Sequence, residues 1–245
     1  MLNEAACVLV HGAWHDASCW NPLVPYLEAS QLEVFTPDLP SHGKNPADPA
    51  RTNLKAYSTY ISQYIENIDN KVILVGHSMA GMVISQVAEE IPDKLARLLY
   101  LSAYLPENGQ SLFSLIAANA AGVGKSPIEE VMQISADKRY FTINPQAIQA
   151  LFYNCSPTDQ SPKAFPRQPA LPFSGKVRLS EANYGRVPKT YICCLDDHVI
   201  PINHQRHMLK NQACDEMVQL DSDHSPFLSC PELLAKVLNS AMKAS

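Results

Sequence analysis

Short apolar runs alternate along the chain with longer stretches in which apolar positions recur at helical spacing. The apolar runs are rich in Val, Leu, Ile and Tyr, and they are apolar on both faces. This pattern is typical of strands in a parallel sheet that helices cover on each side. The predicted strands are Cys7–Val10, Glu33–Thr36, Val72–Val75, Leu98–Leu101, Thr190–Cys194 and Met217–Leu220.

The stretches between these runs predict helices. The last one begins with a proline in its first turn and places Leu234, Val237 and Leu238 on one face, as an amphipathic helix does. Strands that alternate with helices predict an α/β fold with a mostly parallel sheet flanked by helices. The predicted helices are Asn21–Ala29, Asn53–Asn67, Met79–Glu90, Ile202–Asn211 and Pro231–Lys243.

The alternation stops between about Ala103 and Val187, in a region with a proline-rich stretch and separate helical patterns. One interpretation is a long irregular excursion. Segments this long inside compact domains are usually functional, however. We therefore expect a helical lid over residues 104–186, inserted after the sixth strand, above an α/β core of residues 1–103 and 187–245.

Composition narrows the function classes. The chain has 245 residues, 46% hydrophobic and 18% charged, which is typical of a globular protein. A formal charge of −5 without a Lys/Arg cluster argues against a nucleic-acid partner. We see no signal peptide and no window apolar enough to span a membrane. Seven cysteines without a CxxC pair predict reduced thiols and a cytoplasmic protein. We expect a monomer or a homodimer, and the sequence does not distinguish the two.

The stretch GHSMAG, residues 76–81, follows a predicted strand and precedes a predicted helix. That context is the one a nucleophile elbow requires, with Ser78 in a strained turn and small residues two positions away. Gly76 and Ala80 meet the requirement, although the common motif, G-x-S-x-G, has glycine where this chain has Ala80. The alternative is an ordinary helix N-cap serine after a glycine turn.

A second strand ends in His-Gly near the start of the chain, in VLVHGAW, residues 8–14. This stretch is similar to the oxyanion loop of α/β-hydrolases. Acyl transfer places negative charge on the former carbonyl oxygen, and two backbone N–H groups stabilise it. We expect these donors to be Ala13 and Met79, with Gly12 leaving room for the substrate. The alternative is a plain β-turn.

A serine nucleophile needs a base and an orienting acid, in the chain order Ser, Asp, His for this fold. His224 lies in a loop after the last predicted strand, where the base is expected. Asp196 and Asp197 both follow the preceding strand, and at most one of them can orient His224. Asp221 and Asp223 belong to the histidine's own loop and are predicted to form turns.

A metal site is the competing interpretation of nearby residues. His204 and His207 are three apart on a predicted helix, close in sequence to the two aspartates, and could bind zinc. A solvated helix face explains them equally well. No phosphate loop or dinucleotide motif is present. We therefore expect no metal and no cofactor.

The chain resembles the α/β-hydrolase branch of plant methylesterases and hydroxynitrile lyases, with bacterial esterase relatives. The likeness covers both ends of the chain and, weakly, the lid; in the family pattern, Gln follows the acid by eight residues. Gln205 lies eight residues after Asp197, so the resemblance favours Asp197 over Asp196. The stretches that carry it are VLVHGAWHDASCWNPLVPYLEA, VFTPDLPSHG, VILVGHSMAGMVISQVAEEIPDKLARLLYLSA, LFYNCSP, YGRVPKTYICCLDDHVIPINHQ and DSDHSPFLSCP.

The resemblance also separates two chemistries. Hydroxynitrile lyases of this branch carry Thr after the early-loop His and Lys after the catalytic His, whereas this chain has Gly12 and Ser225. Both departures imply an esterase. The methylesterases usually have Met at the second position, so Ser225 leaves the acid product open.

The resulting hypothesis is a cofactor-free serine carboxylesterase for small methyl or aryl esters, with Ser78, Asp197 and His224 as catalytic residues. An apolar acyl pocket is expected from lid aromatics. Three alternatives stay open: cyanohydrin cleavage, hydrolysis of an amide, thioester, lactone or carbon–carbon bond, and a ligand-binding receptor on a hydrolase scaffold. The expected pocket aromatics are Phe113, Phe141, Phe152 and Tyr153.

Overall fold

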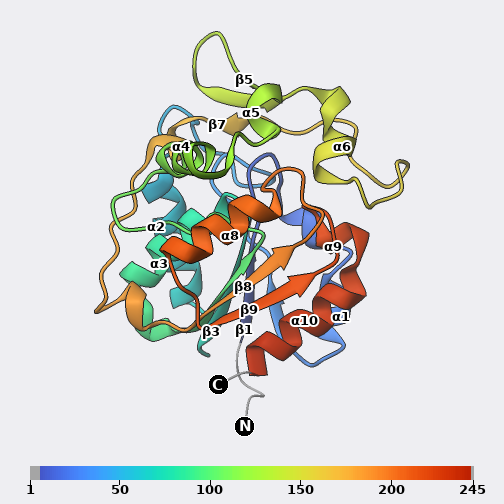
Figure 1. The fold of residues 1–245 in the computed structure, drawn as a ribbon. Coiled ribbons are helices and arrows are strands. Elements are labelled where there is room, and N and C mark those ends of the chain that lie inside the picture. The colour runs from blue at the N-terminus through green and yellow to red at the C-terminus, as the bar shows by residue number, and fades with distance from the viewer. Residues whose placement is uncertain (1–5, 244–245) are drawn as a thin grey trace.

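A computed structural model describes residues 6–243 of the chain. Its centre is a six-stranded sheet in which every neighbouring pair is parallel (Figure 1). The predicted strands are all present, and β3 runs through His77 to the start of the GHSMAG turn. In sheet order they are β2 (Glu33–Phe35), β1 (Ala6–Val10), β3 (Val72–His77), β4 (Leu95–Leu101), β8 (Lys189–Cys194) and β9 (Glu216–Leu220).

Alternate side chains of the strands enter two separate cores, because successive strand residues point to opposite faces. Val8, Leu74 and Tyr100 belong to the larger core, with α2 (Leu54–Glu66), α3 (Ala80–Glu90) and α8 (Ile202–Asn211). Leu9 and Val75 belong to the smaller one. It is covered by η1 (Ala17–Trp20), α1 (Val24–Glu28), α9 (Pro226–Ser229) and α10 (Pro231–Lys243). A sheet buried on both faces explains why its strands are apolar throughout.

Most of the segment between β4 and β8 lies over the carboxyl ends of the strands, and its last part runs back beside α3, where Ser180 and Tyr184 bond Glu89 (Figure 1). We use the name lid for its residues 104–186. A purely helical lid is wrong, because β5, β6 and β7 form a small antiparallel sheet. Four strands precede the lid in the chain, so its expected position after a sixth strand is also wrong. Its elements are α4 (Leu112–Val123), α5 (Ile128–Val131), β5 (Met132–Ile134), β6 (Tyr140–Ile143), η3 (Pro145–Ala147), α6 (Ile148–Phe152), β7 (Gln168–Pro169), α7 (Leu171–Ser174) and η4 (Tyr184–Arg186).

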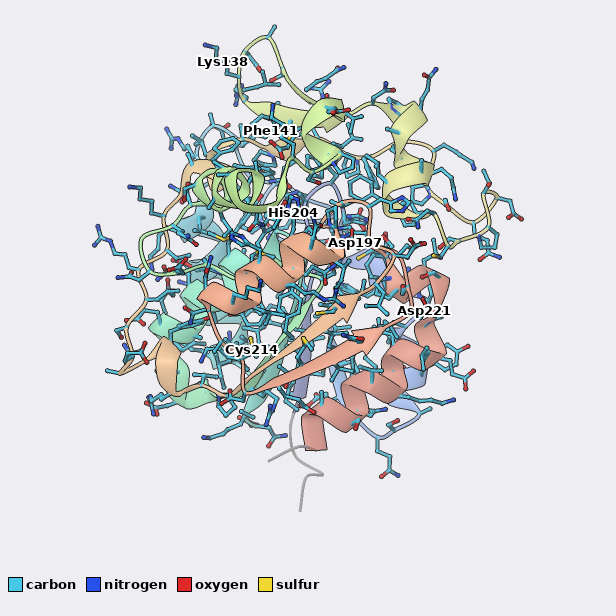
Figure 2. All side chains as sticks on the ribbon, viewed as in Figure 1. Lys138, Phe141, Asp197, His204, Cys214 and Asp221 are labelled. Carbon is cyan, nitrogen blue, oxygen red and sulfur yellow. The ribbon has the colours of Figure 1, made fainter. Side chains whose placement is uncertain are left out.

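The two edges of the sheet differ in what surrounds them. Asp197 lies at the edge that faces the lid, whereas Cys214 lies at the opposite edge (Figure 2).

All seven cysteines are free thiols. None of the helices within residues 6–243 has the length and apolar character needed to cross a bilayer.

Candidate active site

Ser78 occupies a sharp turn between β3 and α3. Its φ of 56° lies in the left-handed region, which a residue with a side chain adopts at a cost of about 1–3 kcal/mol. A Cβ at Gly76 would lie 2.9 Å from the carbonyl oxygen of Ala80 and equally close to Ile84. One at Gly81 would overlap the carbonyl oxygen of Tyr104. The turn therefore depends on the small residues of the GHSMAG stretch, as the sequence predicts.

His224 and Asp197 form a fully buried pair. The Nδ1–H of His224 donates to Oδ2 of Asp197 over 2.7 Å, and neither side chain is exposed to solvent. The other oxygen, Oδ1, accepts the N–H groups of Val199 and Ile200 at 2.7 and 2.8 Å. These contacts fix the carboxylate and aim the opposite nitrogen of the imidazole, Nε2, away from it. That nitrogen is buried and has no hydrogen-bond partner among the described residues.

Asp196 lies outside this arrangement although it is adjacent in the chain. Its side chain is 58% exposed, accepts from Asn154 Nδ2 at 2.9 Å and lies 3.4 Å from His198 Nε2. The structure thus brings one of the two candidate aspartates to His224 and leaves the other at the surface. Gln205 supports this geometry, because its amide bonds both the N–H and the carbonyl oxygen of Cys194, at 3.2 and 2.9 Å, just before the two aspartates.

Asp223 organises the loop that carries His224. Its carboxylate accepts the N–H groups of Ser225 and Cys155, at 3.0 and 2.9 Å, and the hydroxyl of Ser229 at 2.8 Å. The carbonyl oxygen of His224 accepts from Nε2 of His77 at 2.8 Å. The predicted turn-forming role thus fits Asp223, which lies inside the loop, and Asp221 lies exposed at its start (Figure 2).

Two backbone N–H groups lie beside Ser78 without an acceptor. Ala13 and Met79 are buried, and neither N–H donates a hydrogen bond within residues 6–243. Met79 directly precedes α3, whose N-terminus carries partial positive charge from its unpaired N–H groups. Gly12, next to Ala13 in the early loop, lies so close to Ser78 that a Cβ there would be 2.9 Å from the Cβ of Ser78. This arrangement can accept an oxygen that gains negative charge.

A small inner cavity opens beside Ser78. The cavity has the predicted apolar character, but none of the four predicted lid aromatics lines it; one of them, Tyr153, lines a second cavity instead. Phe113 packs edge-on against Phe141 and at a tilt against Phe173, and Phe152 packs against His224 with ring centroids 5.5 Å apart. Composition cannot say which way an aromatic ring points. The lining residues are Ala13, Trp14, Ser78, Met79, Tyr104, Leu112, Ile116, Ile128, Glu129, Met132, Phe173 and Val199.

Several histidines surround the site as neutral imidazoles. Burial lowers the pKa of His77 well below its usual range, and the neighbouring His224 lowers it further. Burial also lowers the pKa of His15 to about 4. His15 donates from Nδ1 to the carbonyl oxygen of Ala13 at 2.9 Å and accepts the hydroxyl of Tyr153 at 2.8 Å. These rings therefore act as fixed hydrogen-bonding groups at neutral pH.

The residues weighed as zinc ligands do not gather. Nδ1 of His207 lies 3.0 Å from the side-chain oxygen of Asn119 in the lid, and the pKa of the buried His204 is lowered mainly by its burial. Over the described range, 6–243, no three His, Cys, Asp or Glu side chains are placed to hold a metal ion.

Sequence reasoning missed two polar contacts of the site. The hydroxyl of Ser102, just after β4, donates to Oδ2 of Asp197, the oxygen that also accepts from His224. Gln168 of β7 accepts the N–H of Trp14 at 3.4 Å and so links the lid to the loop that carries Ala13. A serine directly after a buried strand, at the edge where the other site residues lie, was a usable signal for Ser102. Nothing in the sequence around Gln168 distinguishes it.

These features define a class: a parallel α/β protein with a strained serine between strand and helix, a buried His–Asp pair and free N–H donors beside the serine. The model of the alpha/beta hydrolase family matches residues 7–237, so the chain belongs to that family. The expected fold and family are confirmed, and the chain is an enzyme of the hydrolase class.

Named relatives place the chain more closely. It is 29% identical to methylesterase 7 of Arabidopsis thaliana, over 96% of this chain and 95% of the relative. It is 30% identical to a pyrethroid hydrolase of Sphingobium wenxiniae, over 94% of this chain and 85% of the relative. A crystal structure of a pyrethroid hydrolase superimposes with a TM-score of 0.89 at 27% identity, covering 98% of both chains.

Proposed function

We propose that the protein is a serine carboxylesterase that hydrolyses small carboxylic esters through an acyl-enzyme. The observation that carries the proposal is the buried His224–Asp197 hydrogen bond of 2.7 Å. Nε2 of this imidazole is unpaired, and its ring lies 4.6 Å, between centroids, from the ring of His77, which directly precedes Ser78. The names of the methylesterase and pyrethroid hydrolase relatives support ester bonds as the target. As part of the same proposal we keep the predicted cytoplasmic location and the absence of a cofactor.

The proposed mechanism uses these groups in turn. Ser78 Oγ attacks the ester carbonyl while Nε2 of His224 takes its proton, and the N–H groups of Ala13 and Met79 stabilise the resulting oxyanion. His224 then donates that proton to the departing alcohol oxygen, which leaves an acyl group on Ser78. Water, deprotonated by His224, attacks the acyl-enzyme and releases the acid. Asp197 holds the imidazole tautomer and stabilises its cation.

The position of Gly12 argues against the cyanohydrin alternative. Hydroxynitrile lyases of the resembled branch carry Thr there, and in this structure even a Cβ would lie 2.9 Å from the Cβ of Ser78 and 3.0 Å from Nδ1 of His77. Ser225 stands where those lyases have lysine, so no ammonium group follows His224 to hold cyanide.

The proposal is tested with a panel of p-nitrophenyl and methyl esters plus mandelonitrile, using wild type and Ser78→Ala. We expect ester turnover that the substitution abolishes, and no cyanohydrin cleavage. Cleavage of mandelonitrile without ester turnover would make the protein a lyase. Inactivity on both substrate types, with tight and saturable binding of an ester, would favour a receptor.

A further inference from the structure

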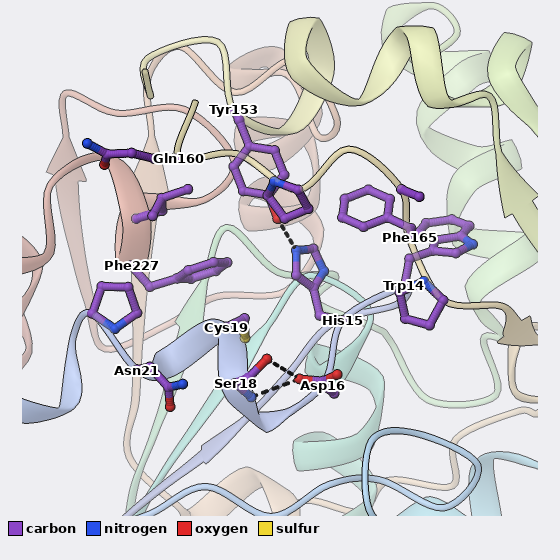
Figure 3. A pocket seen from close by; sticks show the side chains of 15 residues that line it. Trp14, His15, Asp16, Ser18, Cys19, Asn21, Tyr153, Gln160, Phe165 and Phe227 are labelled. Atoms are coloured by element: carbon purple, nitrogen blue, oxygen red, sulfur yellow. Dashed lines mark hydrogen bonds between the residues drawn. The ribbon is translucent and has the colours of Figure 1, made fainter. Parts of the chain in front are cut away.

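A second, larger cavity shares Trp14 with the inner one, and we call it the outer cavity (Figure 3). Its volume is about 370 Å³, against about 20 Å³ for the inner cavity. Most of its wall is aromatic or proline carbon, and polar side chains such as Asn21 and Gln160 stand among the lining residues. The aromatic wall consists of Trp14, His15, Tyr153, Phe165 and Phe227.

The polar atoms of this wall are satisfied within the protein. His15 and Tyr153 point toward each other in Figure 3, and the Tyr153 hydroxyl donates to Nε2 of His15. The remaining ring nitrogen of His15 is bonded to the backbone of Ala13. The buried part of the wall therefore offers ring faces and edges to a ligand, and such a surface favours another aromatic ring.

Two aromatic residues separate the outer cavity from the reacting groups. Trp14 lines both cavities. Phe152, which is buried, has its ring centroid 6.2 Å from that of Trp14, 4.8 Å from Phe165 in the outer cavity and 5.5 Å from His224. For an alcohol group in the outer cavity to reach the imidazole, the side chain of Phe152, at the end of the short helix α6, must turn.

The geometry of acyl transfer then indicates which part of the ester, acyl group or alcohol, each cavity can hold. The alcohol oxygen must lie near Nε2 of His224, because that nitrogen delivers the proton as the carbon–oxygen bond breaks. The inner cavity is lined by Ser78, Ala13 and Met79 but not by His224, so it suits the acyl group. Phe152 and the outer cavity lie on the His224 side, where the alcohol must be.

We propose that the outer cavity is the alcohol subsite and that the preferred esters join a short acyl group to a bulky aryl alcohol. This inference rests on the proposed esterase function. It reverses the substrate shape of a methylesterase, in which the alcohol is as small as possible. The size difference between the two cavities and the aromatic wall are what carry it.

Benzyl acetate and methyl phenylacetate provide the test, because they are isomers that exchange which side of the ester carries the ring. Their alcohols are of similar leaving ability, so binding decides between them. We expect kcat/KM of wild type to be at least about tenfold higher for benzyl acetate. Phe165→Ala should reduce that ratio several-fold. Tyr26→Ala, which truncates an exposed aromatic residue outside the cavity, is the matched control and should leave the ratio unchanged.

Equal rates for the two isomers, or a preference for methyl phenylacetate, would overturn the inference while leaving the esterase function intact. A wild type that hydrolyses no ester would instead contradict the proposed function. A binding measurement keeps the two failures distinguishable: benzyl alcohol is titrated into Ser78→Ala and followed by tryptophan fluorescence, since Trp14 lines the cavity. Saturable binding that Phe165→Ala weakens supports the subsite, and binding that is absent or indifferent to Phe165→Ala overturns it.

Discussion

Asp196 and Asp197 have opposite environments although they are neighbours in the chain. One is exposed and bonded to Asn154, and the other is buried, holds two backbone N–H groups and meets His224. From the residues alone both aspartates were candidates, and only the spacing to Gln205 in the family pattern favoured the second. The structure supplies a reason for that spacing, since Gln205 bonds both backbone polar groups of Cys194 at the end of β8.

Asp197→Asn should therefore reduce kcat by about 10⁴-fold, because an amide favours the wrong imidazole tautomer and cannot stabilise its cation. Asp196→Asn should change kcat less than about twofold, since surface substitutions have small effects. Steady-state kinetics on one p-nitrophenyl ester measures both variants. The reverse ranking would show that Asp196 is the acid.

Ser102 makes a contact that sequence reasoning missed: its place after β4 was a usable signal, but its partner Asp197 lies 95 residues away. Ser102→Ala removes a donor from the carboxylate oxygen that orients His224. A hydrogen bond to a charged group contributes about 1.5–3 kcal/mol, so kcat should fall about tenfold or more while KM changes little. The buried Ser85, which bonds Tyr100 at 2.7 Å, provides the control. Ser85→Ala should lower stability without this loss of kcat, and equal kcat losses in both variants would contradict a positioning role.

At the scale of elements, the sheet and its helices were predictable because burial on both faces makes every parallel strand apolar. The lid was not. β5, β6 and β7 have three, four and two residues, too short for a period to be recognised. What holds the lid in place is also invisible in the sequence. Gln168 of β7 bonds Trp14, His42 and Tyr57, which come from three separate segments of the core.

The Gln168 contacts predict that the lid holds the loop of Ala13 in shape. Gln168→Leu would leave the buried Trp14 N–H and His42 Nε2–H without their acceptor, which costs about 1–3 kcal/mol for each unsatisfied group. We expect a lower urea midpoint and a reduced kcat with little change in KM. Gln168→Glu keeps an acceptor oxygen and should recover part of kcat. A Leu variant with wild-type kcat would show that the loop keeps its shape without the lid.

At the scale of the whole molecule, the site combines the ends of β1, β3, β4, β8 and β9 at one edge of the sheet. That convergence follows from parallel strands, so the motifs after each strand could be assigned to one site from the sequence alone. The cavities could not, because their walls come from ring orientations set by packing between lid and core. Trp14 is an example of a ring whose orientation is set by packing. Its φ is 59°, its Nε1–H donates to the carbonyl oxygen of Phe141, and its ring lines both cavities.

Four buried histidines distributed over this edge predict that the fold is sensitive to acid. Burial lowers the pKa values of His11, His15, His42 and His77, and for His15 the folded-state pKa is about 4. In the unfolded chain an imidazole has a pKa near 6.5, so below that pH it binds a proton that the buried imidazole of the folded protein does not bind. The unfolding free energy therefore has its full value above about pH 6.5 and falls as the pH decreases toward the folded-state pKa. Each such group lowers the unfolding free energy by about 1.4 kcal/mol per pH unit inside its window.

Urea unfolding at pH 7.5, 6.0 and 5.0 measures this dependence above the range where carboxylates titrate. We expect the unfolding free energy to drop steeply below pH 6.5, with an unchanged dependence on urea concentration. His15→Gln keeps an acceptor for the Tyr153 hydroxyl but cannot be protonated, so it should flatten the slope by about one proton, or about 1.4 kcal/mol per pH unit. A wild-type protein equally stable at pH 7.5 and 5.0 would mean that these imidazoles gain protons in the folded state, contrary to their burial.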